Sequence, residues 1–385
     1  MADNSIRDKA AIAGIGTTAY AKDLGQSELE TALEAVRAAL DDAGLAPQDV
    51  DAVFKFDDPG NNELELARNL GVRDLRMWGA IGWGGGATCA PVIHAASAIA
   101  SGMCSVAVAY RARHRGSGGR PWAGTQQRAG GHAAFEAPYG LINPAQQNAV
   151  MARRYMHDYG ATPEHFARVA VTQRQHASRN PRALFRDPIT VDDVLASRMI
   201  ADPLHLLDCC LETDGGCAVV VTSTERARDL KQPPALISAG VQGVGAQHYM
   251  MTPFYKEDAF DLPNVYAARE LYAMAGVGPQ DVDVALLYDV FSPLVLWQLE
   301  AYGFCARGEA GPFVMEGRID WPDGDIPVNT HGGSLSEAYV HGMNHILEAV
   351  RQLRGTSTCQ VEGASVALVA GAPVVPTSAL VLRRV

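Results

Sequence analysis

The chain has 385 residues and a mass of 41.0 kDa, which is enough for about two to four folding units at roughly 100–200 residues per domain. Hydrophobic residues make up 48% and charged residues 19%, so the composition excludes an intrinsically disordered chain. The net charge is −11 and the sequence shows no basic patch, so we expect no nucleic-acid partner. The seven cysteines include no C-x-x-C pair and the amino-terminal residues lack the apolar core of a signal peptide, which is typical of a cytoplasmic protein.

The first predicted elements are a helix and a strand near the amino terminus. Ser27 and Glu30 have the S-x-x-E spacing of a capping box, which predicts that a helix over Leu29–Ala43 begins there. Gly44 follows at the position where a helix C-cap favours a left-handed residue. A strand is expected soon afterwards, over Ala52–Phe56.

Two apolar segments are long enough to be mistaken for membrane spans. Met77–Tyr110 contains no Asp, Glu, Lys or Arg and exceeds the roughly 20 residues that a span needs. It is rich in Gly, Ala and Ser, so we expect a glycine turn, a buried helix over about Cys89–Ser101 and a strand over Ser105–Ala109. Prolines divide the apolar tail Ser365–Leu382 into two predicted strands around a turn. We therefore expect no membrane span.

The chain contains an internal repeat. Ala43–Asp57 reads AGLAPQDVDAVFKFD and Ala275–Asp289 reads AGVGPQDVDVALLYD, with eight of the fifteen positions identical. The second copy also follows a predicted helix, Val265–Ala275, and enters a predicted strand, Val284–Tyr288. Chance similarity between alanine-rich helices does not explain why P-Q-D-V-D recurs between matching elements.

A second set of elements supports this duplication. The glycine turn, helix and strand of residues 84–109 have a counterpart in the loop Asn329–Ala338, a helix over about Val340–Leu353 and a strand over Ser365–Val369. The pattern predicts an α/β fold of two similar halves, residues 1–232 and residues 233–385.

An insertion is expected between the repeated elements, within the first half. The segment of about 111–202 is rich in Arg and His, contains several prolines and includes predicted helices such as Pro163–Ser178. We interpret it as a lid or loop domain.

Three further motifs have simpler explanations than a cofactor site. Gly14-Ile-Gly16-Thr-Thr-Ala19 matches the dinucleotide pattern G-x-G-x-x-A, but no helix is predicted to begin inside it. His341 and His345 lie four residues apart on a predicted helix, without a third metal ligand in view. Three cysteines are expected to be buried packing residues: Cys209, Cys210 and Cys217. We expect no nucleotide cofactor and no metal.

Three loops give more specific signals. Gly82–Thr88 precedes the buried helix, Leu287–Phe291 ends a repeated strand, and Asn329–Gly342 is rich in Gly, Ser and His. In a duplicated α/β architecture, sites form where strand ends and helix N-termini converge.

These loops resemble the thiolase superfamily, specifically its sterol-carrier or lipid-transfer-protein branch, over nearly the whole chain. The third loop is similar to the N-x-x-G-G-x-x-x-x-G-H-P segment of that family, and Asn329, Gly332 and Gly333 match it. The second resembles the family element that reads N-E-A-F or H-D-x-F, and Asp289 and Phe291 match the latter form. The resemblance implies a thiolase-like duplicated fold of two βαβαβαββ halves in five layers, with an inserted loop domain, and a homodimer.

The departures from the family pattern affect its catalytic groups. In the family, the acyl-accepting cysteine lies seventeen residues before the glycine that ends the helix. Counting back from Gly102 places this position at Gly85. Cys89 lies one helical turn further along and is expected to be a core residue. Tyr339 stands in place of the histidine of G-H-P, and Tyr288 in place of the histidine of H-D-x-F. The second catalytic cysteine is also missing, so we expect no thiolase activity.

The residues that remain suit cleavage of a C–C bond without an acyl-enzyme. The resemblance extends to actinobacterial steroid side-chain aldolases, which cleave a 17-hydroxy steroid acyl-CoA to a 17-ketosteroid and propionyl-CoA with an OB-fold partner of the DUF35 type. It implies that Tyr339 and Tyr288 form an acid–base pair for this retro-aldol reaction, with the CoA thioester as substrate and no cofactor. Further residues are expected to support the oxyanion or orient these groups (His341, His331, Asp289 and Gly85) or to bind substrate (Gly332, Gly333 and Ser334).

Two other interpretations stay open. The chain could be a non-catalytic acyl-CoA or sterol-binding scaffold that has lost its cysteines, or a thiolase that uses Cys89. Four arginines that open the insertion could contact CoA phosphates or form a solvated basic loop: Arg111, Arg113, Arg115 and Arg120.

Overall fold

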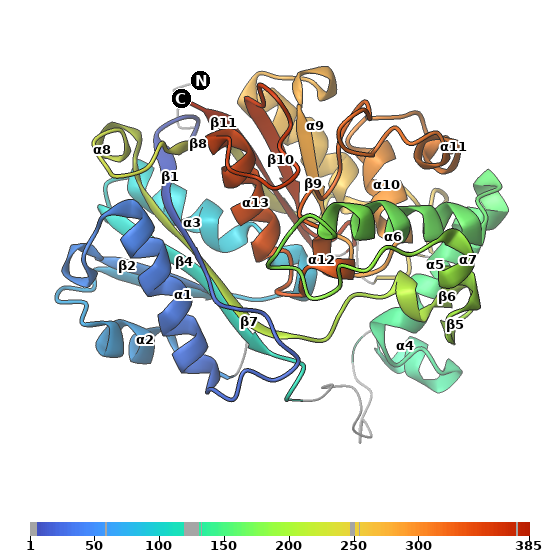
Figure 1. Ribbon diagram of the computed structural model, residues 1–385, viewed down its shortest axis with the longest axis horizontal. Coiled ribbons are helices and arrows are strands. Elements are labelled where there is room, and N and C mark those ends of the chain that lie inside the picture. The colour runs from blue at the N-terminus through green and yellow to red at the C-terminus, as the bar shows by residue number, and fades with distance from the viewer. Residues whose placement is uncertain are drawn as a thin grey trace.

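The computed structural model describes residues 6–57, 60–118, 131, 133–246, 251–253, 255–374 and 376–385. Within these residues nine strands form one twisted mixed sheet in the order β3-β2-β4-β7-β1-β8-β11-β10-β9 (Figure 1). Its strands are β1 Ala10–Thr17, β2 Ala52–Phe56, β3 Met77–Ile81, β4 Val106–His114, β7 Asp214–Ser223, β8 Ala235–Gly243, β9 Val284–Leu287, β10 Val366–Ala370 and β11 Thr377–Arg384. A small hairpin is made of β5 Met199–Ala201 and β6 Leu204–His205.

The strand order is mirrored about the centre of the sheet. In the first half β1 pairs antiparallel with β7, β7 antiparallel with β4, and β4 parallel with β2. In the second half β8, β11, β10 and β9 repeat the same antiparallel, antiparallel and parallel pairings. A parallel bridge from Val328 to β9 takes the place that β3 occupies beside β2. Antiparallel β1 and β8 join the halves, so the internal repeat of the sequence is a repeat of topology.

Helices cover both outer faces of the two half-sheets and fill the space between them. The helices are α1 Glu28–Ala43, α2 Glu63–Leu70, α3 Ala90–Ala100, α4 Ala133–Glu136, α5 Pro144–Tyr159, α6 Pro163–Ala177, α7 Val191–Ala196, α8 Thr224–Ala227, α9 Pro263–Ala275, α10 Pro293–Ala301, α11 Ala310–Met315, α12 Gly333–Ser336 and α13 Met343–Arg354. One apolar cluster joins α1 and α2 to the outer face of the first half-sheet. A second encloses α3 and α13 between the half-sheets, and a third joins α9 and α10 to the outer face of the second. This gives the five layers expected of a thiolase-like fold.

The repeated P-Q-D-V-D segment makes the same contacts in both halves. The first aspartate of each copy closes a short turn, because Asp49 accepts from the Ala46 amide at 2.9 Å and Asp281 from the Gly278 amide at 2.7 Å. The second aspartate, Asp51, accepts from the Val106 amide at the start of β4 at 2.8 Å. Its counterpart Asp283 accepts from the Val366 amide at the start of β10 at 2.9 Å. The second aspartate of each copy therefore has the same structural role, because its carboxylate accepts from the first amide of a neighbouring strand.

The local predictions near the first helix are confirmed. Ser27 and Glu30 form the capping box of α1, which begins at Glu28, and Gly44 ends it with φ 73°. The late helix α13 begins at Met343 rather than near Val340, because His341 and Gly342 have left-handed φ values of 49° and 78°.

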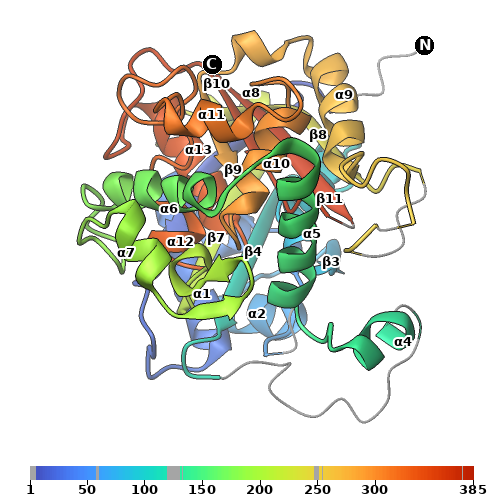
Figure 2. The ribbon, with the colours of Figure 1, turned by 90° about the vertical axis from the view of Figure 1, so that its right-hand side faces the viewer.

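The segment expected as an insertion forms α4 to α7, which lie on the side that faces the viewer in Figure 2. Its last strand, β5, pairs with β6 just beyond the end of the segment. The segment begins later than residue 111, since β4 continues through Arg111 and Arg113 to His114. Both arginines are consequently held on a sheet strand rather than in a surface loop. Among the helices that the structure describes, none is long and apolar enough to cross a membrane.

Candidate active site

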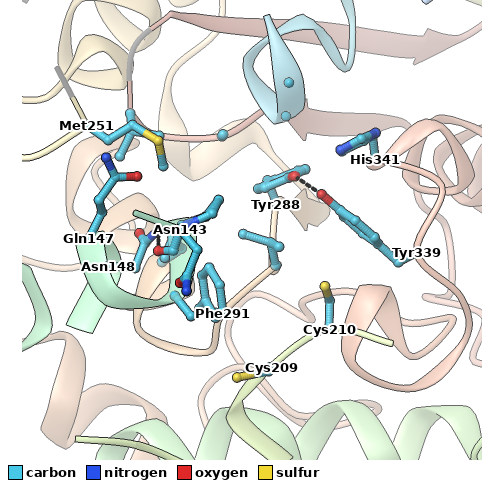
Figure 3. A pocket seen from close by; sticks show the side chains of 18 of the residues that line it. Asn143, Gln147, Asn148, Cys209, Cys210, Met251, Tyr288, Phe291, Tyr339 and His341 are labelled. Carbon is cyan, nitrogen blue, oxygen red and sulfur yellow. Dashed lines mark hydrogen bonds between the residues drawn. The ribbon is translucent and has the colours of Figure 1, made fainter. Parts of the chain in front are cut away.

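A cavity of about 920 Å³ lies where the loop after β9, the glycine-rich loop before α3, the end of β4 and the start of α5 converge. Its volume suits a drug-sized organic molecule. Figure 3 shows Tyr288 and Tyr339 on one side of it, with Asn143, Gln147 and Asn148 of the α5 region on the other. The remaining lining is largely apolar, with Leu206, Val290, Phe291, Leu294 and Val374 among its members.

Tyr288 and Tyr339 are joined through their hydroxyl groups. The two Oη atoms are 2.9 Å apart, and both side chains are buried against the cavity wall (Figure 3). Gln298 fixes the Tyr288 backbone, accepting from its amide at 3.1 Å and donating to its carbonyl at 2.6 Å. The Tyr339 amide donates to Thr213 Oγ1 at 3.0 Å. The rings are thus held from two different segments, so that their hydroxyls meet.

Burial raises the pKa of both phenols. For Tyr288 the pKa lies well above 10 because of desolvation and because the neighbouring Tyr339 disfavours a second negative charge. For Tyr339 desolvation again dominates and the pKa is raised, while Arg113 and the hydrogen bond with Tyr288 act in the opposite direction. At neutral pH the pair therefore holds two neutral hydroxyl groups, each able to accept one proton and donate another.

Gly85 lies directly beneath the Tyr288 ring. A Cβ on Gly85 would lie 2.2 Å from Tyr288 Cζ and 2.3 Å from its Oη, so any larger residue would collide with the ring. The Gly85 carbonyl accepts from Thr88 Oγ1 at 2.7 Å and from the Ala372 amide at 2.9 Å. The hydroxyphenyl end of Tyr288 therefore fills the space that the side chain of the expected nucleophilic cysteine would need.

His341 contacts the same pair from the side. Its ring meets Tyr339 edge-on at 4.6 Å between centroids, and its Nδ1 lies 3.2 Å from Nη1 of Arg113. Because a guanidinium only donates, Nδ1 must accept, and the imidazole hydrogen resides on Nε2. Burial, Arg111 and Arg113 all lower the pKa of His341, so the ring is a neutral hydrogen-bond donor rather than a general base.

The arginines of β4 bring positive charge into the cavity wall. Arg111 is 1% exposed, stacks over the Phe56 ring at 3.9 Å and donates to the Phe56 carbonyl at 3.3 Å. Arg113 is 4% exposed and lines the cavity with Arg115. The interpretation of Arg111 and Arg113 as part of a solvated basic loop is therefore wrong. Arg120 lies outside the described residues.

Asp289 does not line the cavity and instead supports the loop that carries Tyr339. Its carboxylate accepts from the Ser334 amide at 2.8 Å, the Leu335 amide at 3.3 Å and His345 Nε2 at 3.0 Å. These contacts tie the residue after Tyr288 to the start of α12. Asp289 thus holds the two tyrosine-bearing segments in register.

Four residues at the start of the loop Asn329–Gly342 also lie behind the cavity rather than in its lining: His331, Gly332, Gly333 and Ser334. Gly333 has φ 61° and leaves room for Asp289, since a Cβ there would lie 2.1 Å from Oδ2. Gly332, with φ 105°, packs against Ala177 in the same way. His331 is fully buried with Nε2 3.3 Å from His345 Nδ1, and Ser334 is fully buried as well. For Gly332, Gly333 and Ser334 this geometry favours loop support over contact with substrate.

Several lining residues were not anticipated from the sequence. Cys210 lines the cavity beside Tyr339, whereas it was expected only to pack. Asn143, Gln147 and Asn148 reach the cavity because α5 docks against it. The sequence signal for this was the amide-rich run Asn-Pro-Ala-Gln-Gln-Asn at the start of α5, in which Asn143 caps the helix by accepting from the Gln146 amide. Cys89 is fully buried at the start of α3 and is not a lining residue.

The chain is similar to known proteins over nearly its whole length. A family model described as thiolase C-terminal domain-like matches residues 245–382. The sequence is 51% identical to the steroid side-chain-cleaving aldolase of Thermomonospora curvata, over 97% of each chain. It is 49% identical to the 17-hydroxy-3-oxo-4-pregnene-20-carboxyl-CoA lyase of Mycobacterium tuberculosis, over 97% of this chain and 99% of that protein. The solved Ltp2-ChsH2(DUF35) aldolase matches with a TM-score of 0.94 and 50% identity, covering 99% of both chains.

Proposed function

This chain belongs to the thiolase superfamily, in the branch of the steroid side-chain-cleaving aldolases, and we propose that it is a carbon–carbon lyase acting on a steroid acyl-CoA. The substrate is a 17-hydroxy steroid with a C20-carboxyl-CoA side chain, and the products are a 17-ketosteroid and propionyl-CoA. The observation that carries this proposal is the Tyr288–Tyr339 pair, 2.9 Å apart at a cavity whose expected nucleophile position is Gly85. Thiolase chemistry needs a thiolate there, and retro-aldol cleavage does not.

The paired hydroxyls can move the one proton that the reaction transfers. One phenol accepts the proton of the substrate β-hydroxyl, passes its own proton to the second phenol, and the second delivers its proton to the acyl Cα. The oxygen lone pair of the substrate forms the ketone, and the electrons of the broken Cα–Cβ bond become the new Cα–H bond. Because both pKa values are raised, a relay through neutral phenols avoids a buried tyrosinate.

Charge that develops on the thioester oxygen during cleavage needs hydrogen-bond donors. Nε2–H of His341 and the cationic Arg113 lie beside Tyr339 in the cavity wall. We assign them to the enolate oxygen, where one well-placed donor typically contributes about 2.7–4 kcal/mol to the transition state. Protons and electrons balance without an oxidant, a metal or a cofactor.

Two assemblies complete the proposal. The chain binds a DUF35 protein, as the name of its solved relative, the Ltp2-ChsH2(DUF35) aldolase, indicates for that complex. It also forms a homodimer through β3, which lies at the edge of the sheet and carries Trp78 with 53% of its surface exposed. An open strand edge with an exposed indole favours pairing with a second chain.

Mass-spectrometric product analysis tests the activity directly. The purified chain, alone and with a DUF35 protein, is incubated with a 17-hydroxy steroid C20-carboxyl-CoA. Equal amounts of 17-ketosteroid and propionyl-CoA are expected, and the Tyr288→Phe/Tyr339→Phe variant should fold but give neither. Tight binding of the thioester without product under both conditions would show a non-catalytic binding scaffold instead.

A further inference from the structure

His345 lies beside the backbone that carries Tyr288. It is in the first turn of α13, is fully buried and is not a lining residue of the cavity. Its Nε2 lies 3.0 Å from Asp289 Oδ1 and 3.1 Å from the Leu287 carbonyl oxygen. Because a carbonyl oxygen can only accept, Nε2 carries the hydrogen and donates to both atoms in a three-centre hydrogen bond. A single N–H thus joins the residue before Tyr288 to the residue after it.

The other ring nitrogen of His345 faces the loop that carries Tyr339. Nδ1 lies 3.3 Å from Nε2 of His331, and the two rings meet edge-on with their centroids 4.9 Å apart. His331 is the third residue of the loop Asn329–Gly342, in which Tyr339 lies. The ring of His345 therefore contacts both of the segments that carry a tyrosine of the pair.

The supports of Tyr288 act on its own backbone and on its neighbours. Gln298 holds the amide and the carbonyl of Tyr288 itself. Asn329 holds Leu287, accepting from its amide at 2.8 Å and donating to its carbonyl at 2.8 Å. His345 adds a contact across Tyr288, between the residues on either side of it. Because the hydroxyl is at the far end of the ring, a small rotation of this backbone would move it away from the partner hydroxyl, 2.9 Å distant.

Two histidines four residues apart in the sequence have different partners in the structure. The His341 ring meets Tyr339 edge-on and its Nδ1 faces Arg113. His345, one turn further along, faces the backbone on both sides of Tyr288. The start of α13 and the loop before it therefore contact the segments of both tyrosines, with one histidine for each.

We propose that His345 is a positioning residue for the retro-aldol reaction, because its Nε2–H aims the Tyr288 hydroxyl at Tyr339. The inference rests on the proposed function, since it concerns the alignment of the pair that transfers the proton. His345 acts through Tyr288 and does not contact the substrate. Loss of its Nε2–H should therefore lower the rate of the chemical step and leave substrate binding unchanged.

Two amide replacements separate the two ring nitrogens. The side-chain amide of His345→Gln reaches the place of Nε2 and can keep the donor to Leu287 and Asp289. The shorter amide of His345→Asn reaches only the place of Nδ1 and loses that donor. Val350→Ala, at a fully buried side chain of the same helix, is the control for lost stability alone. Each protein, with its DUF35 partner, is assayed for kcat and KM on the 17-hydroxy steroid C20-carboxyl-CoA and for its Tm.

The rates should separate the two amides. His345→Asn should lower kcat about 10- to 100-fold with KM within about twofold, since misplacing a reacting group by about 1 Å can cost 100-fold in rate. His345→Gln should keep kcat within about fivefold of wild type, because it retains the donor. Val350→Ala should keep both constants at a lower Tm.

Tyrosine labelled with ¹³C at Cζ reports on the pair without turnover. The resonances of Tyr288 and Tyr339 are identified by their loss in Tyr288→Phe and Tyr339→Phe. Both should shift in His345→Asn and stay close to wild type in His345→Gln and Val350→Ala.

Wild-type kcat in His345→Asn, or equal losses in the Asn and Gln variants, would overturn the inference. So would an equal loss in Val350→Ala, because destabilisation alone would then explain the effect. If His345→Asn does not fold, ¹⁵N-histidine spectra of the wild type carry the test, and an unprotonated Nε2 on His345, assigned by its loss in His345→Gln, would overturn it. If the wild type gives no product, the proposed function fails, whereas the tyrosine resonances still show whether His345 positions the pair.

Discussion

The hydroxyphenyl end of Tyr288 occupies the space above Gly85, where a Cβ would come within 2.2 Å of Cζ. Glycine at residue 85, the position expected for the nucleophile of the family, therefore makes room for the tyrosine that reaches Tyr339. Neither residue alone would give the present geometry, because a cysteine at residue 85 would exclude the ring. The ring of Tyr288 thus fills the space that the side chain of a cysteine at residue 85 would need.

Gly85→Ala should disable the enzyme by displacing Tyr288. Overpacking of this kind costs about 1–3 kcal/mol of stability, and misplacing a reacting group by about 1 Å can lower the rate 100-fold. The matched control is Gly82→Ala in the same loop, where the nearest atom to the new Cβ is 3.6 Å away. Steady-state rates and thermal denaturation of both variants check this. More than half of the wild-type rate in Gly85→Ala would contradict it.

The tyrosine pair should behave as one catalytic unit. Tyr288→Phe and Tyr339→Phe each break the 2.9 Å contact between the hydroxyls, so each should lower kcat by about 100- to 10,000-fold. The double variant should be little worse than either single one, because groups that act in series are not additive. Thioester binding by calorimetry provides the control for an intact cavity. Multiplicative losses in the double variant would show that the two phenols act independently.

The sequence predicts the repeated elements and the tyrosine pair well, and it predicts poorly which other residues line the cavity. The reasons are physical. The repeat and its capping residues are local, so α1, β2 and their counterparts follow from patterns in the chain. The sequence positions of Tyr288 and Tyr339 identified both residues of the pair, although their catalytic role stays a prediction. Gly333 and Ser334 were expected to bind substrate, but a motif does not indicate which side of a loop faces a cavity. The amide-rich run that contains Asn148 is visible in the sequence, but whether it faces the cavity depends on how the insertion docks, which no local pattern encodes.

Ionisation of the phenols should destabilise the protein at high pH. The unfolded chain releases the protons of Tyr288 and Tyr339 near pH 10, whereas burial raises both pKa values in the folded state. The stabilisation by the neutral phenols is therefore complete below about pH 10 and is lost as the pH rises further, by up to about 1.4 kcal/mol per pH unit for each phenol. Urea unfolding between pH 9 and pH 11 should show a shallower decline in the double Phe variant. Tyr139→Phe, at an exposed ring, is the control. Identical slopes in wild type and the double variant would refute this account.

The assigned tautomer of His341 predicts how its replacements differ. His341→Leu removes both the Nε2–H donor and the acceptor for Arg113, so kcat should fall about 100- to 1,000-fold, as on removal of an oxyanion-hole donor. His341→Gln offers an N–H donor and a carbonyl acceptor and should retain clearly more activity. The pH–rate profile of the wild-type enzyme should also show no inflection near pH 6.5, because burial and the two arginines lower the pKa of His341 well below that value. Equal losses in the Leu and Gln variants would remove His341 from the donor role.

Cys89 should be dispensable for the reaction. Its Sγ is fully buried and faces the Val369 carbonyl at 3.7 Å, and burial raises its pKa, so the reactive thiolate is disfavoured. Cys89→Ala should keep kcat within about twofold, with a stability loss of about 1 kcal/mol from the small cavity it leaves. Peptide mass spectrometry after exposure of the folded wild-type protein to iodoacetamide or to acyl-CoA should find Cys89 unmodified. An acyl group on Cys89, together with lost turnover in Cys89→Ala, would mean that the chain works through a shifted thiolase nucleophile and that the tyrosine pair has another role.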